Sequence, residues 1–352
     1  MDSKAEPAEA REVSNTPRKQ GGVVNKLYPP GPNGKGRVKN HCRKFWWCDC
    51  LVLIIIVLII VLPIIFVAIP KKAQHEINSS TLEVTSQEVT NPTEQGVHLK
   101  LESVIRSGSS YHPTVDGFNA ALSLEGKDPF IHIDIPEAKS EAETHITVDQ
   151  DVKFATLNAF SEYTKTVLGS DKFNVYLNGK TKVHLKGLPA MDVNYNKVVE
   201  MKGLNKLSGL NITDIKILIG SAKLSDGSNM LAKVFIPNPS VMTLDLGNVT
   251  MNLAIDTTAI GYAFLPNLLL KPGNNTVDMQ AHVDPLTVYD QVNRNYKNAI
   301  VPLSVSGNSS VRDGVHLTYY EEAIKSNVVK LDLNVGPALE TALGIKLNTT
   351  ST

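Results

Sequence analysis

The chain has 352 residues, with 35 Lys and Arg against 35 Asp and Glu, so its formal net charge is zero. This balance excludes the basic footprint that nucleic-acid-binding proteins carry, and we expect no nucleic-acid partner. The only three cysteines, Cys42, Cys48 and Cys50, lie within nine residues, which excludes a disulfide-stapled scaffold. A hydrophobic content of 42% is ample for a core, and the length allows about two domains.

Residues 1–44 are rich in Pro, Gly, Lys, Asn and Glu and have only scattered apolar residues. Such a composition cannot bury a core, so we expect a disordered tail. The basic residues at its end favour contact with anionic lipids, and a partner-binding motif is the alternative.

Residues 51–69 follow without a charged side chain. A helix over this stretch is about 28 Å long, close to the roughly 30 Å thickness of the hydrocarbon core. Pro63 is compatible with a membrane helix. We therefore expect a transmembrane anchor over residues 45–72, with the lipid bilayer as the partner of residues 51–69.

The charges on either side of this stretch predict its orientation. Five basic residues lie within the twenty residues before it, and only Lys71 and Lys72 lie in the twenty after it. The positive-inside rule then places the N-terminus in the cytosol and the C-terminal part in a lumen. Trp46 and Trp47 stand where an interfacial aromatic belt belongs.

Cys42, Cys48 and Cys50 flank the cytosolic side of the anchor, where cysteines are candidates for S-palmitoylation. Unmodified cysteines are the alternative. The spacing offers no second ligand pair for zinc, so we expect no metal site there.

The part after the anchor contains six Asn-x-Ser/Thr sequons, and none precedes it. This distribution agrees with translocation into a glycosylating compartment. The candidate glycosylation sites are Asn78, Asn211, Asn248, Asn274, Asn308 and Asn348.

Alternating apolar and polar residues predict half-buried strands over residues 97–101, 130–135 and 249–255. The pair Asn178-Gly179 suits a type I′ turn, so residues 173–186 are predicted to form a hairpin. Apolar residues at helical spacing predict two helices. One runs from Phe154 to Val167 and ends at Gly169, and the other runs from Pro285 to Ala299.

The two predicted helices belong to an internal repeat. Val148-Asp149 precedes the first helix and Val283-Asp284 precedes the second, an offset of 135 residues. We expect a mainly β fold with two tandem β-sandwich domains, each with one helix. Their expected bounds are 76–207 and 208–338, followed by a C-terminal tail over 339–352.

The second repeat resembles the late embryogenesis abundant group 2 domain. The resemblance rests on residues 229–240, which contain Asn238-Pro239-Ser240, and on residues 246–249 and 269–273. It implies a small β-sandwich with one helix, in which a strand ends in an Asn-Pro turn. The first repeat departs from this pattern, because Ser103-Val104-Ile105 stands at the equivalent position.

The whole layout also resembles a fungal family of uncharacterised membrane proteins. Its members have a basic tail with Cys and Trp, one span, an Ala-Gln motif after it (here Lys72-Ala73-Gln74) and tandem domains. The resemblance implies a vacuolar membrane and an acidic lumen. No catalytic residues are carried over from it.

The lumenal part offers little chemistry. It contains no Gly-x-Ser-x-Gly elbow, no His-Glu-x-x-His motif and no cysteine. His132, Asp134 and His145 could suggest a site, but His132 and Asp134 alternate with isoleucines, which places them on a solvated strand face. We therefore expect no catalytic, cofactor-binding or metal-binding residues, and no enzyme.

Three hypotheses about function follow. The leading one is a non-enzymatic single-pass membrane protein whose lumenal domains serve interaction or membrane organisation, with an unknown lumenal protein or lipid partner. The alternative is lipid binding in an apolar cleft, motivated by Phe264, Leu265 and Leu268 to Leu270, which otherwise form a strand core. A lumenal hydrolase is the third.

Overall fold

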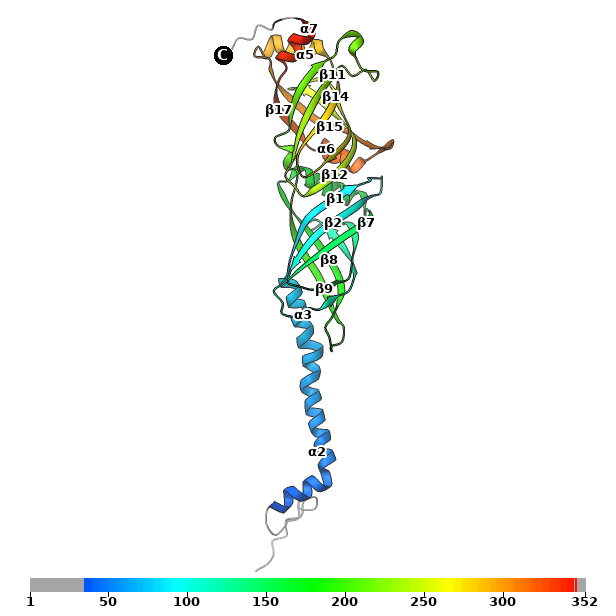
Figure 1. Cartoon of the computed structure of the whole chain (residues 1–352), viewed down its shortest axis with the longest axis vertical. Coiled ribbons are helices and arrows are strands. Elements are labelled where there is room, and N and C mark those ends of the chain that lie inside the picture. Colours follow the sequence, from blue (N-terminus) through cyan, green and yellow to red (C-terminus); the bar gives the residue numbers. More distant parts are fainter. Residues whose placement is uncertain (1–34, 345, 347–352) are drawn as a thin grey trace, which may run out of the picture. The chain divides into compact units, whose positions relative to one another are not determined.

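The structure is a computed structural model, of which we describe residues 35–344 and 346 (Figure 1). The chain separates into one unit that ends at Ala68 and a second that begins at Ile69. Most of the predicted disordered tail and half of the predicted C-terminal tail, including Asn348, lie outside the described residues.

The first unit contains helix α2 (Lys35–Pro63) and the π-helical turn η1 (Ile64–Ala68). Helix α2 begins at Lys35, so the last residues of the predicted tail are helical. The π-turn follows directly after Pro63, which has no N–H to donate and disturbs the regular ladder of a helix. Pro63 thus changes the helical winding within the apolar stretch.

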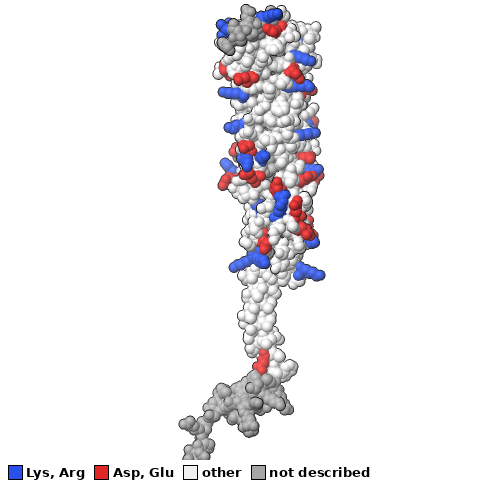
Figure 2. Space-filling view, turned by 60° about the vertical axis from the view of Figure 1, so that its left-hand side comes forward, with Lys and Arg blue, Asp and Glu red and all other residues white. Residues whose placement is uncertain are grey.

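One helix among the described residues, Trp46–Ser79, is long and apolar enough to cross a membrane. Over residues 51–67 of this helix, nearly all large apolar side chains are exposed within the protein; Ile59, for example, is 66% exposed. Figure 2 shows the apolar stretch as white, without acidic or basic atoms. A helical stretch that is apolar on every face and not covered by protein fits a bilayer environment.

The second unit is mainly β. Its strands are β1 (Thr81–Thr90), β2 (Gly96–Arg106), β3 (Thr114–Val115), β4 (Phe118–Ser123), β5 (Pro129–Ile135), β6 (Ala138–Lys139), β7 (Glu143–Lys153), β8 (Lys172–His184), β9 (Met191–Lys202), β10 (Asn211–Ile217), β11 (Met230–Asn238), β12 (Met242–Ile255), β13 (Thr258–Leu270), β14 (Gly273–Val283), β15 (Ile300–Arg312), β16 (Val315–His316) and β17 (Val328–Asn334). The predicted strands over 97–101, 130–135 and 249–255 lie within β2, β5 and β12.

Helices precede, separate and follow these strands along the chain. They are α3 (Ile69–Ser79), α4 (Leu157–Gly169), α5 (Pro285–Asn295), α6 (Thr318–Lys325) and α7 (Gly336–Leu343), with the short turns η2 (Asn205–Leu207) and η3 (Gly220–Ala222). Both predicted helices are confirmed as α4 and α5. Thr156 caps α4 by accepting a hydrogen bond from the Ala159 amide, and Asp284 caps α5.

The strand pairing repeats along the chain. In the first half, β1, β2 and β7 are neighbours in that order, and β5, β4, β8 and β9 form the facing sheet. In the second half, β10, β11 and β14 are neighbours, and β13, β12, β15 and β17 follow the same order. Each half is therefore a β-sandwich, with α4 and α5 at equivalent points.

Two pairings depart from this symmetry. Strand β13 pairs with β14, which joins the two sheets of the second sandwich. Strand β1 pairs in parallel with β12, through Gln87–Val89 and Met242–Leu244, so one continuous sheet contains strands of both halves. The domain bounds 76–207 and 208–338 stay a prediction.

Helices α4 and α6 join the two sandwiches. The Thr164 hydroxyl donates to the Tyr319 carbonyl at 2.8 Å, and the Lys165 ammonium lies 2.9 Å from a Glu322 carboxylate oxygen. Around them, Phe160 stacks on Phe154 and meets the edge of the Tyr319 ring, with centroids 5.1 Å apart. The two halves thereby share one hydrophobic core.

The predicted hairpin over residues 173–186 is wrong. Residues 172–184 form one continuous strand, β8, and Asn178-Gly179 lies in its interior. A Cβ atom at Gly179 would come within 2.5 Å of the Phe118 ring, so glycine here makes room for an aromatic side chain. The turn lies instead between β8 and β9.

The second half also contains two helices that the sequence analysis did not predict, α6 and α7. Helix α7 extends the fold beyond residue 338, where a tail was expected. Leu339 is only 1% exposed and belongs to the core.

Candidate functional site

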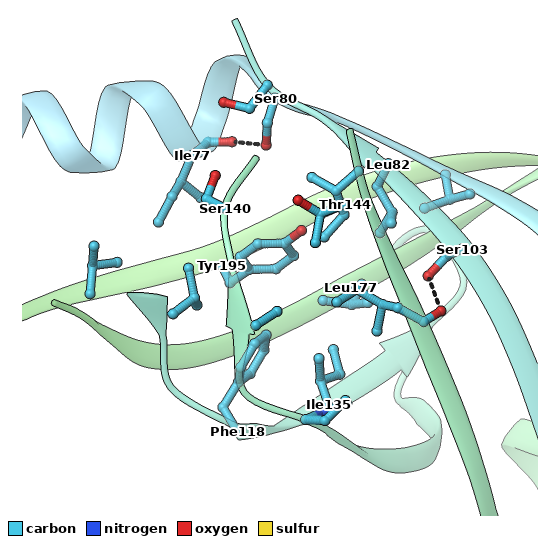
Figure 3. Close-up of a pocket in the computed structure, with 18 of the residues that line it drawn as sticks. Ile77, Ser80, Leu82, Ser103, Phe118, Ile135, Ser140, Thr144, Leu177 and Tyr195 are labelled. Carbon is cyan, nitrogen blue, oxygen red and sulfur yellow. Dashed lines mark hydrogen bonds between the residues drawn. The ribbon is translucent and has the colours of Figure 1, made fainter. Parts of the chain in front are cut away.

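A cavity with a volume of about 290 Å³ lies inside the first sandwich. Its walls come from β1, β2 and β7 on one side and from β4, β5, β8 and β9 on the other. Helix α3 contributes Ile69, Ala73 and Ile77 to the lining, and Figure 3 shows Ile77 among the residues around the cavity. Ile69 is also the last residue of the apolar stretch 51–69.

Apolar side chains make up most of the lining. The strict alternation of β9 turns Met191, Tyr195, Val199 and Met201 toward the cavity. The facing strand β2 contributes Leu99 and further aliphatic residues. An enclosed apolar space of this kind excludes ions and accepts hydrocarbon.

Polar side chains along the wall are paired within the protein. Gln87 donates to the Tyr163 hydroxyl at 3.1 Å, and burial raises the pKa of Tyr163 to about 12. The Ser80 hydroxyl donates to the Ile77 carbonyl at 2.8 Å, and Ser103 donates to the Ile146 carbonyl at 3.4 Å. These groups are therefore not available to a ligand without breaking an internal bond.

Tyr195 is the exception. Its side chain is 6% exposed, and its hydroxyl has no hydrogen-bond partner. Burial raises its pKa to about 12, which keeps the phenol protonated. The ring lies 5.3 Å from that of Phe118, and Figure 3 shows it in the middle of the cavity.

Helix α3 is fastened to the edge of the first sandwich by Gln74. The Gln74 side-chain amide donates to the Asn194 carbonyl, and its carbonyl oxygen accepts from the Asn194 amide, both at 2.8 Å. The side chain thus pairs with β9 as a neighbouring strand would. Gln74 belongs to the Ala-Gln motif that the sequence analysis singled out.

Lys197 fastens the other end of α3. Its buried ammonium donates to the carbonyls of Ile77 and Ser80, and lies 3.4 Å from that of Asn78. A cation at the C-terminus of a helix satisfies carbonyls that have no partner within the helix. Burial lowers the pKa of Lys197.

The second sandwich has smaller cavities, of about 80 and 40 Å³. Three residues of the leucine-rich segment that suggested a lipid cleft, Leu265, Leu268 and Leu270, are core residues beside the first of these. Phe264 is half-buried and Leu269 is exposed. The alternative interpretation, that this segment forms the core of a strand, therefore fits these three leucines. The larger apolar cavity lies in the first sandwich.

The candidate glycosylation sites differ in exposure. Asn78, Asn211, Asn274 and Asn308 are exposed, whereas Asn248 is half-buried. The Asn248 side chain accepts a hydrogen bond from the Asn267 amide at 2.9 Å. We expect the first four to be the better acceptors.

Of the palmitoylation candidates, Cys50 is exposed and Cys48 is half-buried, both as free thiols. The side chain of Cys42 lies outside the described residues. Their modification stays a prediction.

The structure places His132 and Asp134 on the exposed face of β5, as predicted, and His145 is also exposed. No three His, Cys, Asp or Glu side chains converge as a metal site within the described ranges.

A charged group that the sequence analysis missed lies on β2 and β7. The His98 ring is 2.8 Å from an Asp151 carboxylate oxygen and 3.1 Å from one of Asp149. The hydrogen bond with Asp151 is the main reason why the pKa of His98 is raised above 6.5. Only the pairing of β2 with β7 brings these residues together, so no local pattern could have found them.

Comparison with known families gives one match. A family model described as a protein of unknown function, DUF3712, matches residues 128–253. This segment covers just over a third of the chain and runs from β5 into β12. It thus includes parts of both sandwiches. No curated protein sequence matches the chain.

Solved structures give only distant similarity. The periplasmic chaperone SfaE is 7% identical, with 72% of this chain and 98% of that one covered, at a TM-score of 0.18. A bacterial adhesin from Mobiluncus mulieris is 7% identical, with coverages of 69% and 83% and a TM-score of 0.18. The CupB6 tip adhesin from Pseudomonas aeruginosa is 8% identical, with 65% and 94% covered, at 0.19. Scores this low carry no argument.

Proposed function

We propose that this protein is a single-pass membrane protein that binds the hydrocarbon chain of a lipid in its first β-sandwich. The observation that carries the proposal is the largely apolar cavity of about 290 Å³, which has Ile69 in its lining. Among the functions that the sequence suggests, lipid binding is the one for which the described residues supply a site. The proposal involves no catalysis.

The location of the cavity supports this function energetically. Moving a hydrocarbon chain through water costs about 0.8 kcal/mol per methylene group. A chain that passes from the bilayer directly into an apolar cavity exchanges one apolar surrounding for another. Ile69, the last residue of the predicted span, is one of the residues that line the cavity, which supports a short path from the bilayer.

The size of the cavity supports a single chain. Ligand pockets commonly measure about 300–1,000 Å³, and this one lies at the lower limit. Lys72 also lines it, but the Lys72 side chain is exposed and its ammonium lies 4.8 Å from the Tyr111 ring centroid. A charged head group would stay outside with this lysine.

The orientation belongs to the same proposal. The basic residues before the span support a cytosolic N-terminus, which would place the cavity on the lumenal side. The resemblance to fungal vacuolar proteins adds an acidic lumen to this proposal.

Photo-crosslinking tests the function. Full-length protein in nanodiscs is exposed to a photoreactive, clickable fatty acyl probe, and the labelled peptides are identified by mass spectrometry. We expect labels on β2, β8 and β9 in addition to the span. The substitution Val199→Trp fills the cavity and is expected to reduce the β-strand labels about tenfold.

Val198→Trp is the matched control. Val198 is the neighbouring residue on β9, but its side chain is 55% exposed, on the opposite face of the strand. It adds the same indole outside the cavity and should leave labelling unchanged. Labels confined to residues 51–69 in the unchanged protein would refute lipid binding by the sandwich.

A further inference from the structure

One polar group in the lining of the cavity has no partner within the protein. It is the buried hydroxyl of Tyr195, which Figure 3 shows among the residues that line the cavity. A buried hydroxyl without a hydrogen bond costs about 1–3 kcal/mol. Protein interiors rarely leave such a group unpaired unless water or a ligand completes it.

A second buried tyrosine hydroxyl in the lining of this cavity does have a partner. Tyr163 lines the same cavity and has Gln87 as its partner. Of the buried side chains without a partner in the described ranges, which are Ser161, Tyr195 and Tyr320, Tyr195 alone lines this cavity. The unpaired group and the cavity therefore coincide.

We infer that the Tyr195 hydroxyl donates a hydrogen bond to an uncharged acceptor oxygen on the bound chain. The cavity would thus select a single-chain lipid with an ester carbonyl or a hydroxyl group over a plain hydrocarbon. This inference rests on the proposed function.

The charge balance around Tyr195 explains why the acceptor is uncharged. The phenol stays protonated, because burial raises its pKa to about 12. The ammonium of Lys197, on the same strand, is already used by the carbonyls of Ile77 and Ser80. Although this ammonium lies 5.8 Å from the centroid of the Tyr195 ring, a carboxylate placed there would have to compete with those carbonyls for it, and an unpaired buried charge is costly.

Competition tests the inference in full-length protein in nanodiscs. Hexadecane, 1-hexadecanol and methyl palmitate compete with the acyl probe for labelling of β9. We expect Tyr195→Phe to weaken competition by the two oxygenated compounds about 5- to 10-fold and to leave hexadecane unchanged, as the loss of one hydrogen bond predicts. The compound with the larger loss identifies the oxygen that is bound.

Tyr320→Phe is the matched control. The Tyr320 hydroxyl is also buried without a partner, but Tyr320 does not line this cavity, so the substitution should leave the preference among competitors unchanged. Tyr195→Phe removes an unpaired hydroxyl and should leave the ligand-free protein at least as stable.

The two proposals fail in different ways. If the probe labels the cavity, but all three compounds compete with it equally well in Tyr195→Phe and in the unchanged protein, this inference is overturned. The proposal of lipid binding then still stands. If the probe labels no cavity residue in the unchanged protein, the proposed function itself fails.

Discussion

Single buried polar residues determine local structure in this protein. Asn238, at the end of β11, is 1% exposed. Its side chain donates to the Met242 carbonyl at 2.7 Å and accepts from the Ser240 amide and hydroxyl at 3.0 and 2.6 Å. These bonds hold the turn that carries the chain from β11 to β12.

Asn238→Ala should therefore destabilise the second unit. We expect the free energy of unfolding to fall by about 2–3 kcal/mol, because the Met242 carbonyl and the Ser240 amide lose their partner. Thermal unfolding of the full-length protein should show a midpoint about 5 °C lower. The exposed Asn196→Ala is the control, and equal midpoints for both variants would show that the turn does not depend on Asn238.

His98 makes stability depend on pH. Its pKa is raised above 6.5 by the hydrogen bond with Asp151 and by the charge of Asp149, while Thr90 faces it from β1. A raised pKa means that the protonated form stabilises the fold. This contribution is complete below pH 6.5 and is lost as the pH rises through the raised value.

His98→Gln should accordingly reduce the stability of the protein more at acidic pH than at alkaline pH. We expect the difference in unfolding midpoint between the two proteins to be larger at pH 5.5 than at pH 8. A difference that is the same at both values would mean that His98 stabilises only as a neutral ring. An acidic lumen would keep this contribution in place.

Among the elements, α3 has the closest connection with the proposed site. It lines the cavity on one face and is held to β9 by Gln74 and Lys197. The three apolar residues that it contributes to the lining, Ile69, Ala73 and Ile77, follow helical spacing. The attachment of α3 thus decides whether the end of the cavity is covered.

Lys197→Met should release α3. The substitution leaves two carbonyls at the helix end without a donor, and we expect a local loss of roughly 2–3 kcal/mol. Hydrogen exchange of residues 69–79 should become faster, while β2 and β8 stay protected. Lys182→Met, at an exposed position of β8, is the control; unchanged exchange of α3 in Lys197→Met would show that Gln74 suffices.

The strands and helices were predictable where one local pattern sufficed. Alternation identified β2, β5 and β12, and helical spacing identified α4 and α5. The prediction of a turn at Asn178-Gly179 was wrong, because Gly179 makes room for the ring of Phe118, which lies on another strand. Local composition contains no information about such a contact.

The candidate site was only partly predictable. The sequence suggested a lipid cleft, but in the leucine-rich segment of β13 rather than in the first sandwich. A signal was present in residues 191–202, where Lys197 occupies an inward position of a strictly alternating strand. That Tyr195 lacks a partner could not be foreseen, because it depends on every side chain around the cavity.

At the scale of the whole molecule, the internal repeat is visible in the way the strands pair. The charged side chains are spread over both halves. Figure 2 shows acidic and basic side chains interspersed over the face of the sandwiches that it presents. Such a mixture agrees with the neutral net charge and offers no single-sign surface there for nucleic acid.

Glycosylation tests the proposed orientation of the molecule. We expect glycosidase treatment to increase the mobility of the full-length protein on a gel, since Asn78, Asn211, Asn274 and Asn308 are exposed. Asn248→Gln should not change the glycosylated mobility, because that side chain is half-buried. The absence of any shift in the unchanged protein would contradict the lumenal placement of the sandwiches.

An experimental structure of the full-length protein in lipid nanodiscs would show whether a lipid chain occupies the first sandwich. We expect elongated density between β2 and β9, ending within hydrogen-bonding distance of the Tyr195 hydroxyl. A cavity that holds only water, with α3 still fastened by Gln74 and Lys197, would contradict this expectation.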